Sequence, residues 1–105
     1  MRVKILGKYY NLKFVTFLGH NDSQKEEEIL GKCSDPNEVD RQILIKKGLS
    51  PKLELDVTCH EAFHGFLWNY DEAFIDQFGT EFSEILWKLG YRRLTKEQRK
   101  TLEME

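Results

Sequence analysis

The stretch DVTCHEAFHGFLWNYDEAF, residues 56–74, decides how the rest of the chain is interpreted. It contains two of the chain's three histidines, His60 and His64, with Glu61 directly after the first. Apolar residues recur through it at helical spacing, which predicts a helix over residues 51–68. On a helix, side chains four positions apart lie one above the other, so the two imidazoles are expected on the same side.

A second helix is predicted to follow at once. Asn69 and Tyr70 suit a tight turn, Asp71 is a suitable N-cap, and helical spacing continues to Gly90. The two helices are therefore expected to pack as an antiparallel hairpin. Thr95 and Gln98, at the spacing of a capping box, predict a short third helix near the C-terminus.

The part of the chain before residue 50 is predicted to be mostly β-structure. Residues 1–7 and 13–18 are rich in Val, Ile, Phe and Thr, and KYYN between them fits either a turn or the start of the second strand. Residues 19–28 are polar and charged and are expected to form a solvated loop. Two more strands are expected within residues 28–37 and 41–48. The prediction is a single α+β domain over residues 1–105, with a short antiparallel or mixed sheet packed on the first helix and its antiparallel partner.

Composition excludes several classes of partner. The formal charge of −2 and a pI of about 5.9 provide no general attraction to nucleic acid or to an anionic membrane. No segment has the length of apolar sequence that spans a membrane, and residues 1–10 lack the features of a signal peptide. We expect a cytoplasmic protein, in which Cys33 and Cys59 stay free thiols.

The predicted first helix separates its apolar side from its histidines. Its core side is expected to carry Leu55, Cys59, Ala62, Phe63 and Phe66. His60 and His64 point to nearly the opposite side, with Glu61 beside them. The motif is H-E-x-x-H, in which two histidines bind one metal ion, Zn²⁺ as the leading candidate, and the glutamate acts as the general base. Its alternative is a chance pair of surface histidines.

Catalytic zinc needs a third protein ligand. The second helix offers Glu72 and Asp76, which spacing alone does not separate, while His20, Cys33 and Cys59 are weaker candidates. Gly79 on the same flank would let the two helices approach closely. The buried stripe of this helix is expected to consist of Phe74, Phe78, Phe82, Ile85 and Leu89.

Residues 31–93 resemble a known family, the small single-domain H-E-x-x-H proteins of bacteriophage genomes. These are minimal zincins, akin to gluzincins and to the peptidase domain of the ImmA/IrrE type. Five features carry the resemblance. Before the H-E-x-x-H motif stand a G-x-C-x-x-P motif (Gly31, Cys33, Pro36), an I-x-I strand (Ile43, Ile45) and Asp56. After it stand Glu72, which follows the loop, and an LW-x-LGYR motif from Leu86 to Arg92. It implies a zinc peptidase with His60, His64 and Glu72 as ligands and Glu61 as general base. Glu72 stands only eight positions after His64, closer than in the larger gluzincins.

The expected function is therefore hydrolysis of a peptide or protein substrate. The reaction is expected in the cytoplasm, which is the cytoplasm of the host if the chain is phage-encoded. Residues 41–48 could hold an extended substrate by strand addition. Candidates for stabilising the oxyanion are Tyr70, Tyr91 and Arg92. The main alternative is a non-catalytic zincin-shaped binding module with exposed Trp68, Tyr70 and Trp87, and a further one is hydrolysis of a different bond. A basic cluster near the C-terminus is interpreted as solvated: Arg92, Arg93, Lys96, Arg99 and Lys100.

Overall fold

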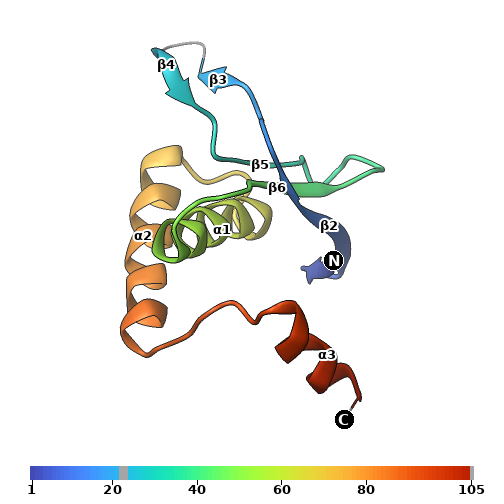
Figure 1. Ribbon diagram of the computed structural model, residues 1–105. Coiled ribbons are helices and arrows are strands. Elements are labelled where there is room, and N and C mark those ends of the chain that lie inside the picture. The colour runs from blue at the N-terminus through green and yellow to red at the C-terminus, as the bar shows by residue number, and fades with distance from the viewer. Residues whose placement is uncertain (22–23, 105) are drawn as a thin grey trace.

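The computed structural model describes residues 1–21 and 24–104, and the side chains of residues 20–27, 103 and 104 lie outside that description. A four-stranded mixed sheet packs against helices, which confirms the predicted α+β class. Helix α1 (Pro51–Phe66) lies between the sheet and helix α2 (Glu72–Lys88), as Figure 1 shows. Within the described residues, helix α3 (Lys96–Met104) packs against no other helix or strand.

The sheet begins with a tight hairpin. Strand β1 (Arg2–Ile5) pairs antiparallel with β2 (Lys8–Val15) across a two-residue turn. Both turn residues, Leu6 and Gly7, have positive φ (49° and 82°), which is the backbone of the turns that match strand twist best. The segment KYYN, which the sequence left open, therefore belongs to β2.

Strand β6 (Gln42–Lys46) occupies the interior of the sheet. It pairs parallel with β2 on one side and antiparallel with β5 (Gly31–Cys33) on the other, which gives the order β1-β2-β6-β5. Because both of its edges are paired, the expectation that residues 41–48 could add a substrate strand is wrong. The edge strand on this side of the sheet is β5.

The charged segment after β2 is not a plain loop. Its backbone forms a small antiparallel pair, β3 (His20–Asn21) and β4 (Gln24–Glu28), so the prediction for residues 19–28 is wrong. Strand pairing uses backbone groups alone and needs no apolar alternation, which is why the sequence pattern gave no sign of it.

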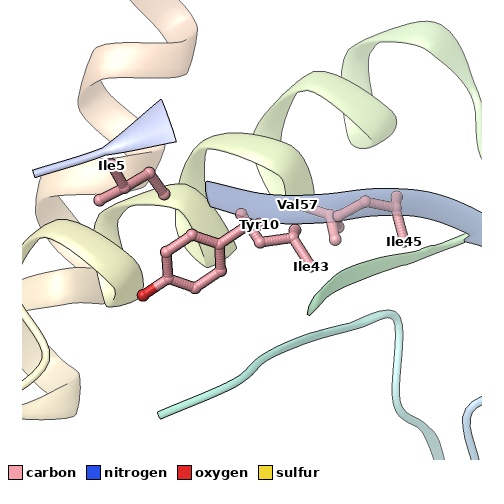
Figure 2. Packing of buried hydrophobic residues seen from close by; sticks show 5 residues of the cluster. All are labelled: Ile5, Tyr10, Ile43, Ile45 and Val57. Carbon is pink, nitrogen blue, oxygen red and sulfur yellow. The ribbon is translucent and has the colours of Figure 1, made fainter. Parts of the chain in front are cut away.

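The core is built where the sheet meets α1. Figure 2 shows inward side chains of β1, β2 and β6 meeting the first helix. Their alternation along the strands sends every second residue to this side, as expected for a sheet with one covered face. The fully or nearly buried members are Ile5, Tyr10, Ile43, Ile45 and Val57.

The sheet-facing line of α1 differs from the predicted one. Val57, Glu61 and Gly65, at intervals of four, are buried toward the sheet. A Cβ at Gly31 would lie 2.8 Å from Val57 Cγ1 and from Glu61 Cγ, so β5 approaches this line closely. Cys59 is buried as predicted, but Phe66 is 41 % exposed. The apolar residues of α1 cover a broad side of the helix, and their pattern did not show that the line with Glu61 would face the strands.

The predicted buried stripe of α2 is also wrong. Ile75, Gly79 and Ser83 are the buried residues of this helix, whereas its aromatic stripe is at least 40 % exposed. The close approach predicted at Gly79 is confirmed, because a Cβ there would lie 3.2 Å from His60 Cα. Contact at a glycine lets α2 pack through small residues, and this rotates the phenylalanines toward the edge of the interface.

Local signals at the helix ends were predicted correctly. Ser50 Oγ accepts a hydrogen bond from Leu53 N (3.4 Å), and Asp71 Oδ1 accepts one from Phe74 N (2.7 Å). At the end of α2, Gly90 has a φ of +91°, which suits the left-handed residue that closes a helix. Thr95 and Gln98 form the reciprocal bonds of a capping box at 2.9 and 3.1 Å.

Candidate metal centre

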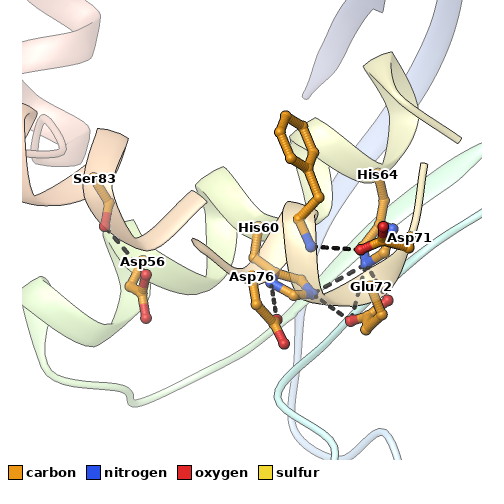
Figure 3. Close-up of polar contacts among 8 residues, drawn as sticks. Asp56, His60, His64, Asp71, Glu72, Asp76 and Ser83 are labelled. Atoms are coloured by element: carbon orange, nitrogen blue, oxygen red, sulfur yellow. Dashed lines mark hydrogen bonds and ion pairs between the residues drawn. The ribbon is translucent and has the colours of Figure 1, made fainter. Parts of the chain in front are cut away.

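Three side chains from α1 and α2 converge on one point. His60 Nε2 and His64 Nε2 are 3.1 Å apart, and Glu72 Oε1 lies 3.2 Å from His60 Nε2 and 3.3 Å from His64 Nε2. Figure 3 shows these three side chains pointing toward one another across the two helices. The histidine side chains are only 23 % and 18 % exposed, while that of Glu72 is 65 % exposed. The group is therefore open to solvent on one side.

Asp76 lies behind the group and does not complete it. Its Oδ1 is 3.0 Å from His60 Nδ1, the ring nitrogen that faces away from Glu72. A carboxylate in this position accepts a hydrogen bond from Nδ1–H, so Nε2 keeps its lone pair and the ring is held in one orientation. Of the two carboxylates that spacing left open, the structure brings Glu72 into the group that could hold a metal ion, while Asp76 contacts His60 from the other side.

The close packing of α2 on α1 creates this arrangement. Asp71 begins α2 directly beside the group, so Glu72 stands in its first turn. One turn further, Asp76 is level with His60, and contact at Gly79 brings the helices close enough for both carboxylates to reach the imidazoles. Near the other end of the interface, Ser83 Oγ donates a hydrogen bond to Asp56 Oδ1 at 3.1 Å (Figure 3).

The donor set fits a divalent metal ion. Donors about 2.0–2.1 Å from zinc at the corners of a tetrahedron lie roughly 3.3 Å from one another. The measured separations among His60, His64 and Glu72 are 3.1 to 3.3 Å. Two imidazoles and one carboxylate leave a fourth corner on the exposed side. These three residues could hold a metal ion.

Glu61 occupies a different position from the three converging residues. Its side chain points to the sheet, where a Cβ at Gly31 would lie 2.9 Å from Glu61 Oε2, and the residue is only 8 % exposed. Burial, with smaller contributions from the negative charges of Glu72 and Asp76, raises the pKa of Glu61 to about 7. Glu61 thus lies between the converging group and the edge strand β5.

The other predicted ligands are not part of the converging group. Cys33 lies on β5 near Glu61 and Cys59 is in the helix interior; both are free thiols, as expected. Burial raises the pKa of Cys33 to about 12 and that of Cys59 to about 11, so neither supplies a thiolate at neutral pH. The side chain of His20 lies outside the described part of the chain.

Two of the predicted oxyanion donors lie at the wrong end of α2. Arg92 stacks over Trp87 at 3.3 Å and donates to two backbone carbonyls, and Tyr91 follows the last turn of the helix. A helix of this length separates its ends by roughly 24 Å. Tyr70, 58 % exposed, lies in the turn just before Asp71, at the end of α2 that carries Glu72.

One cavity of the described structure lies away from the histidines. It measures about 750 Å³ and lies between the first turns of α1, the end of α2 and the segment before α3, with Phe14, Leu86 and Trp87 in its lining. None of His60, His64 and Glu72 borders it. The converging group therefore lies outside this cavity.

Comparisons of the whole chain with protein-family models, with curated proteins and with solved structures gave no match. What the described residues support is a possible metal site, formed by His60, His64 and Glu72 in a small α+β fold. None of the helices in the described part of the chain has the length and apolarity needed to cross a membrane.

Proposed function

We propose that the protein is a zinc-dependent peptidase of the minimal zincin type. The observation that carries the proposal is the convergence of His60 Nε2, His64 Nε2 and a Glu72 oxygen within 3.1 to 3.3 Å. The support that Asp76 gives to His60 Nδ1 adds to it, because ligating histidines usually have such a partner.

Zinc is the metal that suits this donor set best. Two histidines and one glutamate with an open fourth position form one of the known catalytic zinc sites, whereas calcium and magnesium prefer sites made of oxygen atoms. A zinc ion held here supplies a Lewis acid and lowers the pKa of a water molecule at the open corner. His60, His64 and Glu72 fix the position of that corner.

Glu61 is the proposed general base. It follows His60 directly and lies between the ligands and β5, so its carboxylate can take a proton from a water molecule that attacks a bond lying along that strand. A pKa raised by burial favours proton uptake near neutral pH. The same carboxyl can then give the proton to the leaving amine.

The edge of β5 supports a peptide as the substrate. In the described residues β5 pairs only with β6, so its other edge presents backbone groups to an incoming extended chain. Gly31 on this strand touches Glu61, which places such a chain beside the proposed base. The uncovered backbone selects for extended peptides and does not define a preferred side chain.

Zinc content and cleavage test this proposal separately. Glu61→Gln should keep zinc bound and abolish cleavage of an unfolded protein, whereas His64→Ala should lose zinc and cleavage together. Glu81→Gln, an exposed position on α2, is the control for removing one carboxylate and should retain both. Full cleavage by Glu61→Gln, or wild-type protein without zinc after growth and dialysis with excess metal, contradicts the proposal.

The same measurements distinguish the two carboxylates of α2. Glu72→Ala should abolish stable zinc binding, and Asp76→Asn should weaken it by about 10- to 100-fold while keeping one zinc per chain. A larger loss of zinc affinity for Asp76→Asn than for Glu72→Ala would exchange the two roles.

A non-catalytic binding module is the second candidate. It is favoured by Trp68 and Tyr70, which are 38 % and 58 % exposed in the turn between α1 and α2. In this case Glu61→Gln leaves capture of a protein partner unchanged, and Trp68→Ala abolishes it.

A further inference from the structure

The cavity of about 750 Å³ lies at the end of α2 that is remote from the converging group. Its size is within the range of about 300–1,000 Å³ that small-molecule sites occupy. Most of its lining is apolar and comes from β2, the region around the start of α1 and the end of α2, and it includes Leu12, Phe14, Leu49, Leu55, Leu86 and Trp87. These six side chains are half-buried, so each keeps apolar surface that a ligand would cover.

The walls of the cavity are held in place by contacts within the chain. Leu12, Phe14 and Leu49 pack against the buried core between the sheet and α1. Arg93, in the segment between α2 and α3, donates from Nη1 to Glu54 Oε1 at 3.2 Å, and its guanidinium lies 3.8 Å from the centre of the Phe14 ring. These contacts tie that segment to α1 and β2. The cavity is therefore preformed, as small-molecule sites usually are.

The border of the cavity is basic. Four members of the basic cluster near the C-terminus contribute to its lining: Arg92, Arg93, Lys96 and Arg99. Two of them already have partners, since Arg92 stacks over Trp87 at 3.3 Å and Arg93 pairs with Glu54, the only acidic residue of the lining in the described chain. Lys96 and Arg99 form no ion pair with any of the side chains that the structure describes, those of residues 1–19 and 28–102.

The two unpaired cations lie on one side of α3. Side chains three positions apart are neighbours on a helix, so the positive charges of Lys96 and Arg99 repel each other. Helix α3 packs against no other helix or strand of the described chain (Figure 1), and both side chains border the cavity. An anion between them removes the repulsion. The planar fork of Arg99 suits a carboxylate, which it can bind through two parallel hydrogen bonds.

Apolar walls and two unpaired cations at the border together define a class of ligand. An apolar chain covers the walls, and one negative group is needed beside α3. We propose that the cavity binds an aliphatic carboxylate, with its chain against Phe14, Leu55 and Leu86 and its carboxylate between Lys96 and Arg99. Along α2, Leu86 is roughly 21 Å from Glu72. The site is thus separate from the converging group and does not rest on the proposed peptidase activity.

Isothermal titration calorimetry of the full chain with decanoate, kept below its micelle concentration, tests the proposal. One decanoate should bind per chain with a dissociation constant of about 10–100 µM. In the series from hexanoate to decanoate, each added CH₂ should strengthen binding by about fourfold, because it is buried against the apolar walls. Decyltrimethylammonium, which has the same chain and the opposite charge, should bind at least about 10-fold more weakly than decanoate.

Charge removal on α3 tests the position of the carboxylate. Lys96→Gln and Arg99→Gln together should weaken decanoate binding at least about 10-fold and should not weaken that of decyltrimethylammonium. Lys100→Gln is the matched control, because it removes the same charge from a residue of α3 that does not border the cavity. It should change decanoate affinity by less than about twofold. Circular dichroism verifies that every variant is folded.

Trp87 reports where the chain of the ligand lies. The sequence contains two tryptophans, so Trp68→Phe leaves Trp87 alone, and decanoate should change its fluorescence emission. The proposal is overturned if decanoate does not bind, if decyltrimethylammonium binds equally well, or if the double variant on α3 keeps the wild-type affinity. Binding that leaves the emission of Trp87 unchanged also overturns it. Binding of decyl phosphate but not of decanoate would show that the proposed class of ligand is wrong.

Discussion

Replacing Glu61 by Gln should stabilise the metal-free protein, and increasingly so as the pH rises. Glu61 is 8 % exposed, and burial raises the pKa of its carboxyl from 4.5 to about 7 in the folded chain. The folded state therefore binds this proton more tightly than the unfolded state does. The contribution of Glu61 to stability is most favourable at low pH and is lost as the pH rises from about 4.5 through about 7.

The size of the effect follows from the two pKa values. A rise in the pKa of Glu61 from 4.5 to about 7 means that proton binding stabilises the folded state by about 3 kcal/mol at low pH. About 1 kcal/mol of this stabilisation is lost by about pH 5, and nearly all of it is lost above about pH 8. Glutamine is neutral at every pH and has almost the same shape. The stability gained by Glu61→Gln should thus increase by about 2 kcal/mol between about pH 5 and pH 8.

Urea unfolding in the presence of a chelator measures this difference. The free energy of unfolding of the wild type and of Glu61→Gln is compared across the pH range, so that contributions of all other groups cancel. Glu81→Gln, an exposed position on α2, is the control for loss of a glutamate charge. With saturating zinc the advantage of glutamine should shrink, because a cation beside Glu61 favours the carboxylate. If the difference in free energy of unfolding between Glu61→Gln and the wild type does not change with pH, burial does not raise the pKa of Glu61.

Three further predictions concern the packing of α2 and the effect of zinc on stability. Gly79→Val should lower the free energy of unfolding by about 1–3 kcal/mol and weaken zinc binding, because a Cβ added at this position would lie 3.2 Å from His60 Cα. Unchanged zinc affinity in a calorimetric titration would contradict this prediction. Ser83→Ala should lower the free energy of unfolding in urea by about 1 kcal/mol, because it removes the hydrogen bond to Asp56. If Ser83→Ala lowers it equally in a variant without the Asp56 carboxylate, the hydrogen bond contributes nothing. Chelation of zinc should lower the melting temperature of the wild type but leave that of His64→Ala unchanged, since only the former gains free energy from the ion.

The local features of the chain could be predicted because they depend on neighbours in sequence. Ser50 and Asp71 cap their helices, and the capping box at Thr95 is formed. His60 and His64 stand on one side of α1 for the same reason, since four residues span slightly more than one helical turn. The α+β class followed from the separation of strand-like and helical patterns along the chain.

The assignment of faces could not be predicted. An apolar stripe such as that of Phe74, Phe78 and Phe82 indicates that a helix is amphipathic and does not identify the surface that covers it. Here Gly79 sets the line of contact with α1, and the stripe lies beside that line. Strand β6 was likewise recognised, but its place inside the sheet depends on pairing with β2, which is distant in sequence.

The sequence by itself determined the helices, their caps and the pair of imidazoles, because each depends on the geometry of a few consecutive residues. Only the tertiary structure decided that Glu72 joins the histidines while Asp76 supports His60 from behind, and that Glu61 is buried against Gly31. These roles depend on how closely two helices and one edge strand approach, within about an ångström. Distances of that kind are fixed by packing between distant parts of the chain and are not encoded in the spacing of residues along it.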